Sequence, residues 1–309
     1  MEYQWYPGHM AKAKKQMQED LKLIDLIIEL TDARVPDSGR NPDLQTMGAS
    51  KSRLILLNKA DLADPALNAR WVEHYKREGY AAAAIDARTR NKIGKVQDAI
   101  TKACKKKRER DARRGIQNRP VRAMVVGIPN VGKSTFINTF AGKAAAKTGN
   151  KPGVTKGKQW IRLNKDVQLL DTPGILWPKF ADQTTGLHLA LIGSMNDQIL
   201  DTDELAIQLL QILQKQYPAC CETYYGIAPD ADPVKLLHSI AKVRNCIKKG
   251  GEVDYSKAAA LLLDDFRAGR LGRITLEEPE DPGCRTAKDA QQTKRSAEWR
   301  NDQKSRRDK

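Results

Sequence analysis

The chain has 309 residues, more than one hydrophobic core usually fills, so we expect a principal domain with a second domain or a sizeable appendage. Charged residues make up 30% of the sequence, and no apolar run is long enough for a membrane-spanning helix. The formal net charge of +16 favours polyanionic partners, and RNA and DNA are the commonest of these in cytoplasm.

The start of the sequence carries no recognisable targeting segment. MEYQWYPGHMAKAKK has neither the apolar core of a secretory signal nor the Ser- and Arg-rich composition of an organellar one, so we expect a cytoplasmic protein. The five cysteines are odd in number and lack the spacing of zinc ligands or redox pairs. We therefore interpret them as reduced thiols.

Apolar β-like runs alternate with helical patterns in the first part of the chain. Three runs lie within residues 25–36, 52–61 and 80–87, the last being weaker. A fourth begins at residue 121 and leads into a glycine-rich turn and a helix, and a fifth lies within 167–174. Strands that alternate with helices predict a mostly parallel α/β sheet.

After about residue 185 the pattern becomes helical. Three helices are predicted within residues 201–218, 232–251 and 254–272; the second begins Asp-Pro and ends Gly-Gly, as helix punctuation requires. Their apolar stripes indicate a core. We therefore predict an α/β domain at 1–185, a small all-α domain at 186–276, and a basic disordered tail at 277–309.

The stretch GIPNVGKS, residues 127–134, fits the phosphate-loop pattern and lies between a predicted strand and a predicted helix. Its glycines let the backbone wrap closely around phosphates, and the N–H groups at the helix start bind them. Lys133 would reach the terminal phosphate oxygens, and the Ser134 hydroxyl would ligate magnesium. A purely structural turn is the alternative interpretation.

The stretch DTPG, residues 171–174, is a weak motif alone, but it follows the phosphate loop at the end of an apolar strand. Asp171 would hold magnesium through water there, and the N–H of Gly174 would sense a γ-phosphate. Thr155 lies between the two motifs on a Gly- and Pro-rich segment, where its hydroxyl could complete the magnesium shell.

The tetrapeptide NKAD, residues 58–61, comes before the phosphate loop. An ionised Asp61 can accept hydrogen bonds from the ring N–H and exocyclic amine of guanine, whereas adenine offers the wrong pattern. Asn58 can approach the acceptor side of the base, and the alkyl stem of Lys59 can lie over it.

Along the chain the order is NKAD, GIPNVGKS, Thr155 and DTPG. This order resembles that of the circularly permuted GTPases, whose guanine-reading half precedes the phosphate-binding half. WYPGHMAKAKKQM and DARVPDSGRNPDL narrow the resemblance to the ribosome biogenesis GTPase A family, also called YlqF, over residues 1 to about 275. The resemblance implies a permuted P-loop GTPase domain followed by a small all-α domain. The basic run 102–119 then joins the former chain ends.

The resemblance also implies roles by position. Guanine would be bound by Asn58, Lys59, Ala60 and Asp61, with a second segment, Asp86 and the N–H of Ala87. Phosphates would be held by Asn130, Val131, Gly132, Lys133, Ser134, Thr135 and Gly174, and magnesium by Ser134, Thr155 and Asp171. In potassium-stimulated relatives an asparagine placed like Asn130 helps bind K⁺. Asp86 departs from the family pattern, because a small hydroxyl residue is usual there.

The water-positioning residue is missing from its usual place. A glutamine often follows the DxxG motif of GTPases, but Ile175 follows Gly174 here, and its side chain cannot orient water. We predict that His9 supplies this function, since an imidazole can orient water near neutral pH and the flanking Pro-Gly suggests a mobile loop. The catalytic set would then be His9, Lys133, Thr155 and Gly174. A structural or RNA-contacting role for His9 remains the alternative.

Three classes of function fit these patterns. The first is a GTPase that acts late in large ribosomal subunit assembly, with GTP, Mg²⁺ and K⁺ as ligands. Its partners would be the subunit precursor, with its rRNA and ribosomal proteins. Away from the ribosome we expect a monomer. The second is a GTP-gated RNA-binding module in which hydrolysis is dispensable. The third is a P-loop phosphotransferase, which NKAD and the basic charge disfavour.

Overall fold

A computed structural model describes residues 8–42, 44, 48, 50–90, 93–116, 119–142, 159–162, 166–171, 182–195 and 200–280. Contacts group residues 1–277 into one compact unit and residues 278–309 into a second. The predicted boundary at residue 185 therefore lies inside the first unit and stays a prediction.

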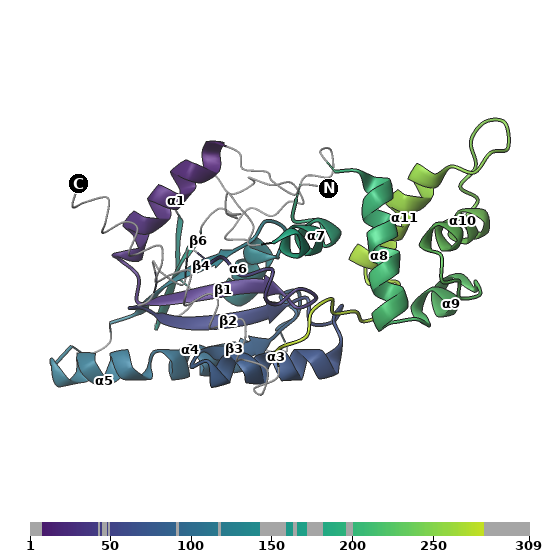
Figure 1. Cartoon of the computed structure of the whole chain (residues 1–309). Coiled ribbons are helices and arrows are strands. Elements are labelled where there is room, and N and C mark those ends of the chain that lie inside the picture. The colour runs from purple at the N-terminus through teal and green to yellow at the C-terminus, as the bar shows by residue number, and fades with distance from the viewer. Residues whose placement is uncertain are drawn as a thin grey trace, which may run out of the picture. The chain divides into compact units, whose positions relative to one another are not determined.

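A six-stranded sheet forms the centre of the first unit (Figure 1). The strand order is β3-β2-β1-β4-β6-β5, and only the last pair is antiparallel. All five predicted β runs are strands of this sheet, whereas the short edge strand β5 was not foreseen. The strands are β1 (Leu26–Asp32), β2 (Ser52–Asn58), β3 (Ala81–Ala84), β4 (Val121–Gly127), β5 (Gln159–Arg162) and β6 (Val167–Asp171).

Helices cover both faces of the sheet, and its central strands are mostly apolar on both sides, with buried polar exceptions such as Glu29. On one face, alternate residues of β1 such as Leu26 and Ile28 share a core with helices α4 (Ile93–Ala103) and α6 (Lys133–Ala141). On the other face Ile27 packs in a cluster with α1 (Gly8–Leu21), and β2 packs in another with α3 (Pro65–Arg77). The predicted parallel α/β architecture is confirmed.

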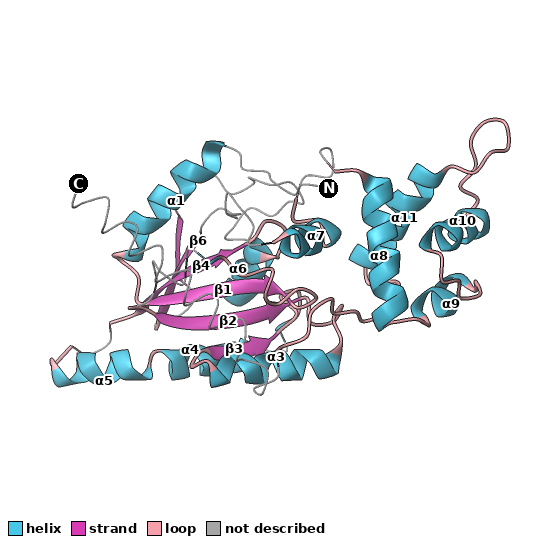
Figure 2. Cartoon of the chain, viewed as in Figure 1, coloured by secondary structure: helices cyan, strands magenta, loops and turns pink. Residues whose placement is uncertain are grey.

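The chain after the sheet is helical (Figure 2). Aspartates cap four of these helices by accepting N–H groups of the first turn, the preference expected at this position. The helices are α7 (Gln183–Leu191), α8 (Thr202–Gln216), α9 (Cys220–Tyr225), α10 (Pro233–Val243) and α11 (Tyr255–Arg267).

The Gly-Gly pair was predicted to end a helix, and this detail was wrong. Helix α10 ends at Val243, and Gly250 and Gly251, both with positive φ, turn the chain between Ile247 and Val253, which form an antiparallel bridge. Glycine suits such a turn because it has no Cβ to clash.

No helix within the described residues is long and apolar enough to cross a membrane. Four of the predicted thiols, Cys104, Cys220, Cys221 and Cys246, are free, and Cys284 lies outside the described residues.

Candidate active site

The motifs meet at one edge of the sheet because parallel strands end on the same side. In the register, Asp32 pairs with Asn58, Leu30 with Gly127, and Val125 with Asp171. The strands β1, β2, β3, β4 and β6 therefore end at the same edge of the sheet. Motifs that are far apart in the sequence are thereby brought to a single site.

The phosphate loop runs from β4 into α6. Gly132 has a φ of +94°, a conformation that favours glycine, and a Cβ there would lie 2.6 Å from the Asn58 amide nitrogen. Both the backbone conformation and the lack of space therefore favour glycine. Lys133 is buried, and its ammonium donates to the carbonyls of Gly127 and Ile128, at 3.1 and 2.9 Å. The phosphate loop therefore folds over the ammonium group of Lys133. This loop lies at the amino-terminal, positive end of α6.

Asn130 ties the phosphate loop to the end of α7. Its side chain Nδ2 donates to the carbonyl of Gly193 at 2.8 Å, and the Ser194 hydroxyl donates to the carbonyl of Pro129 at 3.0 Å. Asn130 has a φ of +58°, a conformation that asparagine tolerates better than most residues. The contact with Gly193 uses the amide nitrogen of Asn130. A potassium ion would need the amide oxygen instead.

Asn58 joins three loops through its side-chain amide. It is 2% exposed; its Nδ2 donates to the carbonyl of Val131 at 2.7 Å, and its Oδ1 accepts the N–H of Ala87 at 2.8 Å. Both ends of the amide that was expected beside guanine thus have protein partners, as does the Ala87 N–H assigned to the base, and the second N–H of Nδ2 can still donate to a base. The physical reason is burial, since a polar group without water needs a protein partner.

We expect Asn58→Ala to weaken nucleotide binding and stability together. The change leaves a buried carbonyl and a buried N–H unpaired, which costs about 2–4 kcal/mol, and it separates the phosphate loop from the segment after β3. Urea unfolding and GDP titration check this, with GDP affinity falling by about tenfold or more. The control is Asn68→Ala, which removes one bond to the carbonyl of Ala60. Equal GDP affinity in the two variants would contradict the bridging role.

Asp61 has an unsatisfied oxygen suited to a ligand. Its Oδ1 is buried without a hydrogen-bond partner among the described residues. Its Oδ2 lies 2.5 Å from the guanidinium of Arg88, which also contacts Asp86 at 3.0 Å. A buried carboxylate oxygen is costly to leave unpaired. The arrangement fits a ligand that brings N–H donors, as the Watson–Crick edge of guanine does.

Lys59 is positioned by a buried carboxylate, that of Asp32. Lys59 has a φ of +58°, and its ammonium lies 3.0 Å from Asp32, which is fully buried and is bound through both oxygens by Arg34, at 2.9 and 2.8 Å. Burial alone would raise the pKa of Asp32, but the charges of Arg34 and Lys59 and their hydrogen bonds hold that pKa well below its usual range. Asp32 therefore stays ionised and fixes the lysine of the guanine-reading loop.

Arg34 extends this network to helix α11. Its Nη1 donates to the carbonyl of Arg267 at 3.1 Å, and its guanidinium lies 5.5 Å from the ring centre of Phe266. The side chain of Arg267 in turn donates to the carbonyls of Ala190 and Leu191, at the end of α7. The guanine-reading loop, α11 and α7 are therefore held by one set of buried contacts.

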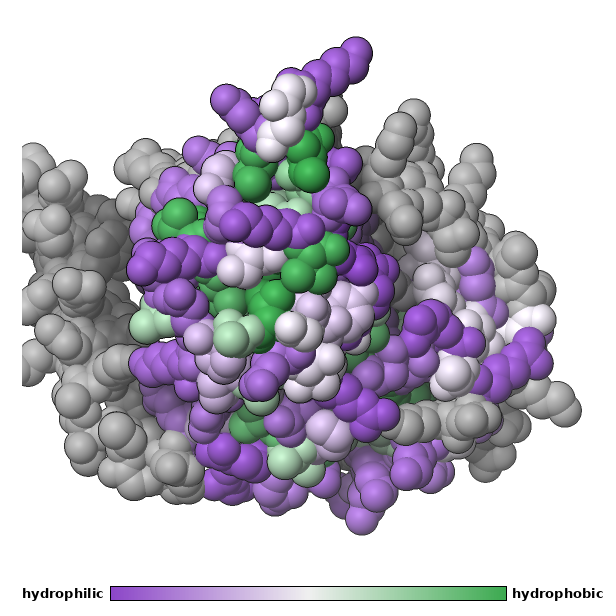
Figure 3. All heavy atoms as spheres, turned by 90° about the vertical axis from the view of Figure 1, so that its right-hand side faces the viewer, coloured by the Kyte–Doolittle hydropathy of each residue, from purple (hydrophilic) through white to green (hydrophobic). Residues whose placement is uncertain are grey.

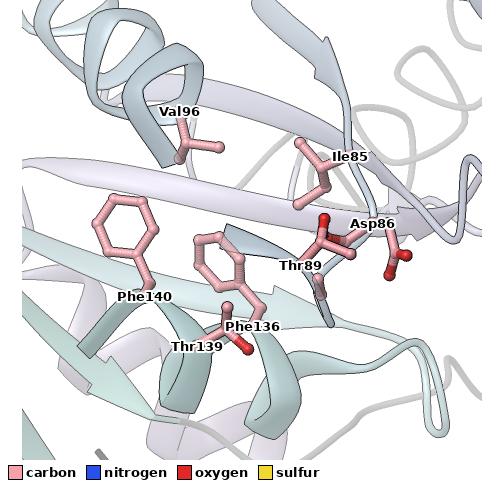
Figure 4. Close-up of a pocket in the computed structure, with 8 residues that line it drawn as sticks. Ile85, Asp86, Thr89, Val96, Phe136, Thr139 and Phe140 are labelled. Atoms are coloured by element: carbon pink, nitrogen blue, oxygen red, sulfur yellow. The ribbon is translucent and has the colours of Figure 1, made fainter. Parts of the chain in front are cut away.

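A small apolar hollow lies beside the segment after β3 (Figure 4). The rings of Phe136 and Phe140, both from α6, face Val96 and Ile85 across it, and the carboxylate of Asp86 points away. Its enclosed space is about that of one water molecule, too small for a nucleotide. The hollow is thus the packing contact between α6 and the segment after β3.

Some predicted site residues lie outside this geometry. Thr155 and Gly174 are not among the described residues, and Asp171 is placed as the last residue of β6 without a described side chain. His9 was expected on a loop, but its backbone lies in the first turn of α1, which begins at Gly8. Asp32 and Arg34 were missed: they lie in the DARVP stretch, which ends a predicted strand and carries part of the family resemblance, and neither was assigned a role at the site.

Residues 122–219 match a family model described as 50S ribosome-binding GTPase. Ribosome biogenesis GTPase A of Bacillus cereus is 46% identical over 285 residues, which cover 92% of this chain and 96% of that protein. The protein of the same name from Thermotoga maritima is 33% identical and covers 90% of this chain and 95% of its own length. Mitochondrial ribosome-associated GTPase 1 of Mus musculus is 34% identical, with 91% of each chain covered.

Solved structures give the same result. The crystal structure of GNP-bound YlqF from Thermotoga maritima superposes with a TM-score of 0.64 at 28% identity, covering 87% of this chain and 99% of that one. A GDP-bound YlqF structure gives a TM-score of 0.64 at 27% identity, covering 86% of this chain and 100% of that one. The similarity therefore extends over the sheet and the helical region.

Proposed function

The chain belongs to the ribosome biogenesis GTPase A family and is a GTPase, and from this premise we propose that it hydrolyses GTP while bound to the precursor of the large ribosomal subunit, at a late step of that subunit's assembly. Its partners would be ribosomal RNA and ribosomal proteins in the cytoplasm, and it would be a monomer away from them. The named relatives and the net charge of +16 support the ribosomal part of this proposal.

The observation that carries the nucleotide part is the buried, unpartnered Oδ1 of Asp61, at the same sheet edge as the phosphate loop. In the proposed complex Asp61 accepts the ring N–H and amine of guanine, and the Lys59 stem lies against the base. Asn58 connects the phosphate loop to the segment after β3 through its contacts with Val131 and Ala87. Arg88 would give up its contact with Asp61 when guanine binds.

The phosphates would lie against the N–H groups of residues 130–135, with Lys133 turning from its carbonyl partners to the phosphate oxygens. Ser134, Thr155 and Asp171 are oxygen donors, the ligand type that magnesium prefers, and would hold the ion that neutralises charge on the β- and γ-phosphates. The Asn130 oxygen would hold K⁺. The N–H of Gly174 would respond to the γ-phosphate.

Water would be oriented by His9, because Ile175 occupies the position of the usual glutamine and offers no polar atom. His9 lies in the first turn of α1, so a movement of that helix end would bring it to the site. We propose that the ribosomal particle supplies this movement, which makes hydrolysis slow in the free protein and fast on the particle.

The helical region supports contact with a large assembly. Figure 3 shows apolar side chains gathered among hydrophilic ones on the face it presents. Val243 and Ile247 are 53% and 49% exposed, and the neighbouring Lys242, Arg244 and Lys248 are exposed cations. A mixed apolar and basic surface of this kind suits a ribonucleoprotein partner.

The test is GTP and ATP hydrolysis by the purified protein, with and without large ribosomal subunits, in potassium and in sodium. We expect subunits to raise GTP turnover, and His9→Ala to lower the stimulated rate by about 100-fold or more while GDP still binds. Potassium should give the faster rate. His74→Ala is the control, because His74 lies on α3 and pairs with Glu78.

Unchanged stimulated turnover in His9→Ala would remove His9 from the mechanism. If subunits bind the GTP-loaded protein but never raise turnover, the GTP-gated RNA-binding module becomes the better account. Transfer of phosphate to a small-molecule acceptor would instead support the phosphotransferase class.

A further inference from the structure

Helix α5 (Lys105–Arg113) is a strongly basic helix that adds little to the core. Cys104, which directly precedes α5, is fully buried. Among the described side chains of α5 itself, only that of Lys107 is buried. The exposed cations of this segment are Lys105, Arg108, Arg110, Arg113 and Arg114. The helix is therefore built to present charge and not to fill space.

The base of the helix is firmly attached to the sheet. The Lys107 ammonium lies 2.6 Å from Asp111 and 3.6 Å from Asp25, and Asp25 also accepts the N–H of Arg122 at 3.1 Å. Burial raises the pKa of the Cys104 thiol to about 11, so this anchor stays a neutral, apolar group. The attachment fixes the direction in which the exposed cations point.

These contacts engage two of the carboxylates near the arginines, and Glu109 is an exposed carboxylate on α5 itself. Asp25 and Asp111 are both engaged by Lys107, and the hydrogen bond from that ammonium lowers the pKa of Asp111, so it remains ionised. Arg110 and Arg113 are three residues apart on one helix face, where like charges cost about 0.2–0.5 kcal/mol. A helix that keeps such a row of charges at its surface suits a polyanion.

The helix lies far from the phosphate loop. Asp25 directly precedes β1, and the phosphate loop follows the opposite, carboxyl end of β4. A seven-residue strand separates the two edges by about 23 Å. Figure 1 shows α5 continuing beyond α4 past the amino-terminal ends of the strands. An anion bound there cannot be the phosphate group of GTP.

We propose that α5 is a second RNA-binding element, which contacts the phosphate backbone of folded RNA from the sheet edge opposite the GTP site. The proposal rests on the proposed function and adds the location and chemistry of one contact. RNA is favoured over a protein partner because the exposed side chains described on α5 are cationic, apart from Glu109 and Ala112, whereas the helical region exposes large apolar residues. Arginine also binds phosphate through paired N–H groups.

The test compares two variants with equal loss of charge. Arg108→Gln/Arg110→Gln/Arg113→Gln removes three cations from α5, and Arg70→Gln/Lys76→Gln/Arg77→Gln removes three exposed cations from α3. Binding of a double-helical RNA is measured at several salt concentrations, and glutamine keeps the helix propensity. We expect the α5 variant to bind about tenfold or more weakly at low salt, with a salt slope smaller by about 2, and the α3 variant to bind within about twofold of wild type.

Equal losses in the two variants would show that only net charge matters and would overturn the proposal, as would wild-type affinity in the α5 variant. Competition by polyglutamate as strong as that by unlabelled RNA would assign the helix to a protein partner. GDP affinity and thermal unfolding of both variants confirm folding. If the α5 variant binds RNA normally while subunits stimulate GTP hydrolysis by the wild-type protein, the inference about α5 fails and the proposed function stands. If subunits do not stimulate the wild-type protein, the proposed function fails instead.

Discussion

Asp61→Asn is expected to lower the affinity for GDP by about 100-fold to 10,000-fold and to raise the affinity for xanthosine diphosphate. Each charge-assisted hydrogen bond is worth about 1.5–3 kcal/mol, and guanine would lose two of them. The new amide can donate to the C2 carbonyl of xanthine, where guanine carries an amine. The change also removes the contact with Arg88, but Arg88 is 66% exposed, so that loss has little effect on stability.

Titrations with GDP, xanthosine diphosphate and ADP measure the change directly. Asp64→Asn is the matched control three residues away: Asp64 caps α3 by accepting the N–H groups of Ala66 and Leu67, and asparagine caps equally well. GDP affinity within about threefold of wild type in Asp61→Asn would show that the buried Oδ1 does not read the base.

Arg34→Met is expected to destabilise the protein by about 3–5 kcal/mol, because it leaves the buried carboxylate of Asp32 with Lys59 as its remaining cation. Methionine fills much of the volume, so most of the loss comes from charge. Thermal unfolding should move down by roughly 10 °C, and urea unfolding gives the free energy. Arg88→Met is the control, since its ion pairs are exposed and worth about 0–1 kcal/mol.

The loss should also depend on pH. The pKa of Asp32 is depressed in the folded protein, so its stabilisation is complete above its unfolded pKa of about 3.9 and is lost as the pH falls through the folded value. Without Arg34 that pKa rises. The difference in unfolding free energy between wild type and Arg34→Met should therefore be largest at neutral pH and narrow below about pH 4. A difference that is small and constant across this range would contradict the assignment of Asp32 as an ionised anchor.

The sequence predicted five of the six strands and the mostly parallel sheet. These depend on short-range patterns: apolar runs of strand length, glycines with positive φ such as Gly132, and aspartates before helices such as Asp201. Such patterns act over a few residues, so they can be read without knowing what lies across the fold. The position of Asp61, three residues after the end of a buried strand, is of this kind.

The tertiary structure alone decided which polar groups are already engaged. The sequence points to Asn58 as a base-contacting residue, and only the fold shows that Val131 and Ala87 contact both ends of its amide. Arg34 and Arg267 are 233 positions apart and meet only because α11 packs beside the segment after β1. Sequence patterns record whether a side chain is polar. Only the folded chain shows which partner removes it from water, and in a buried site that partner determines what the residue is free to bind.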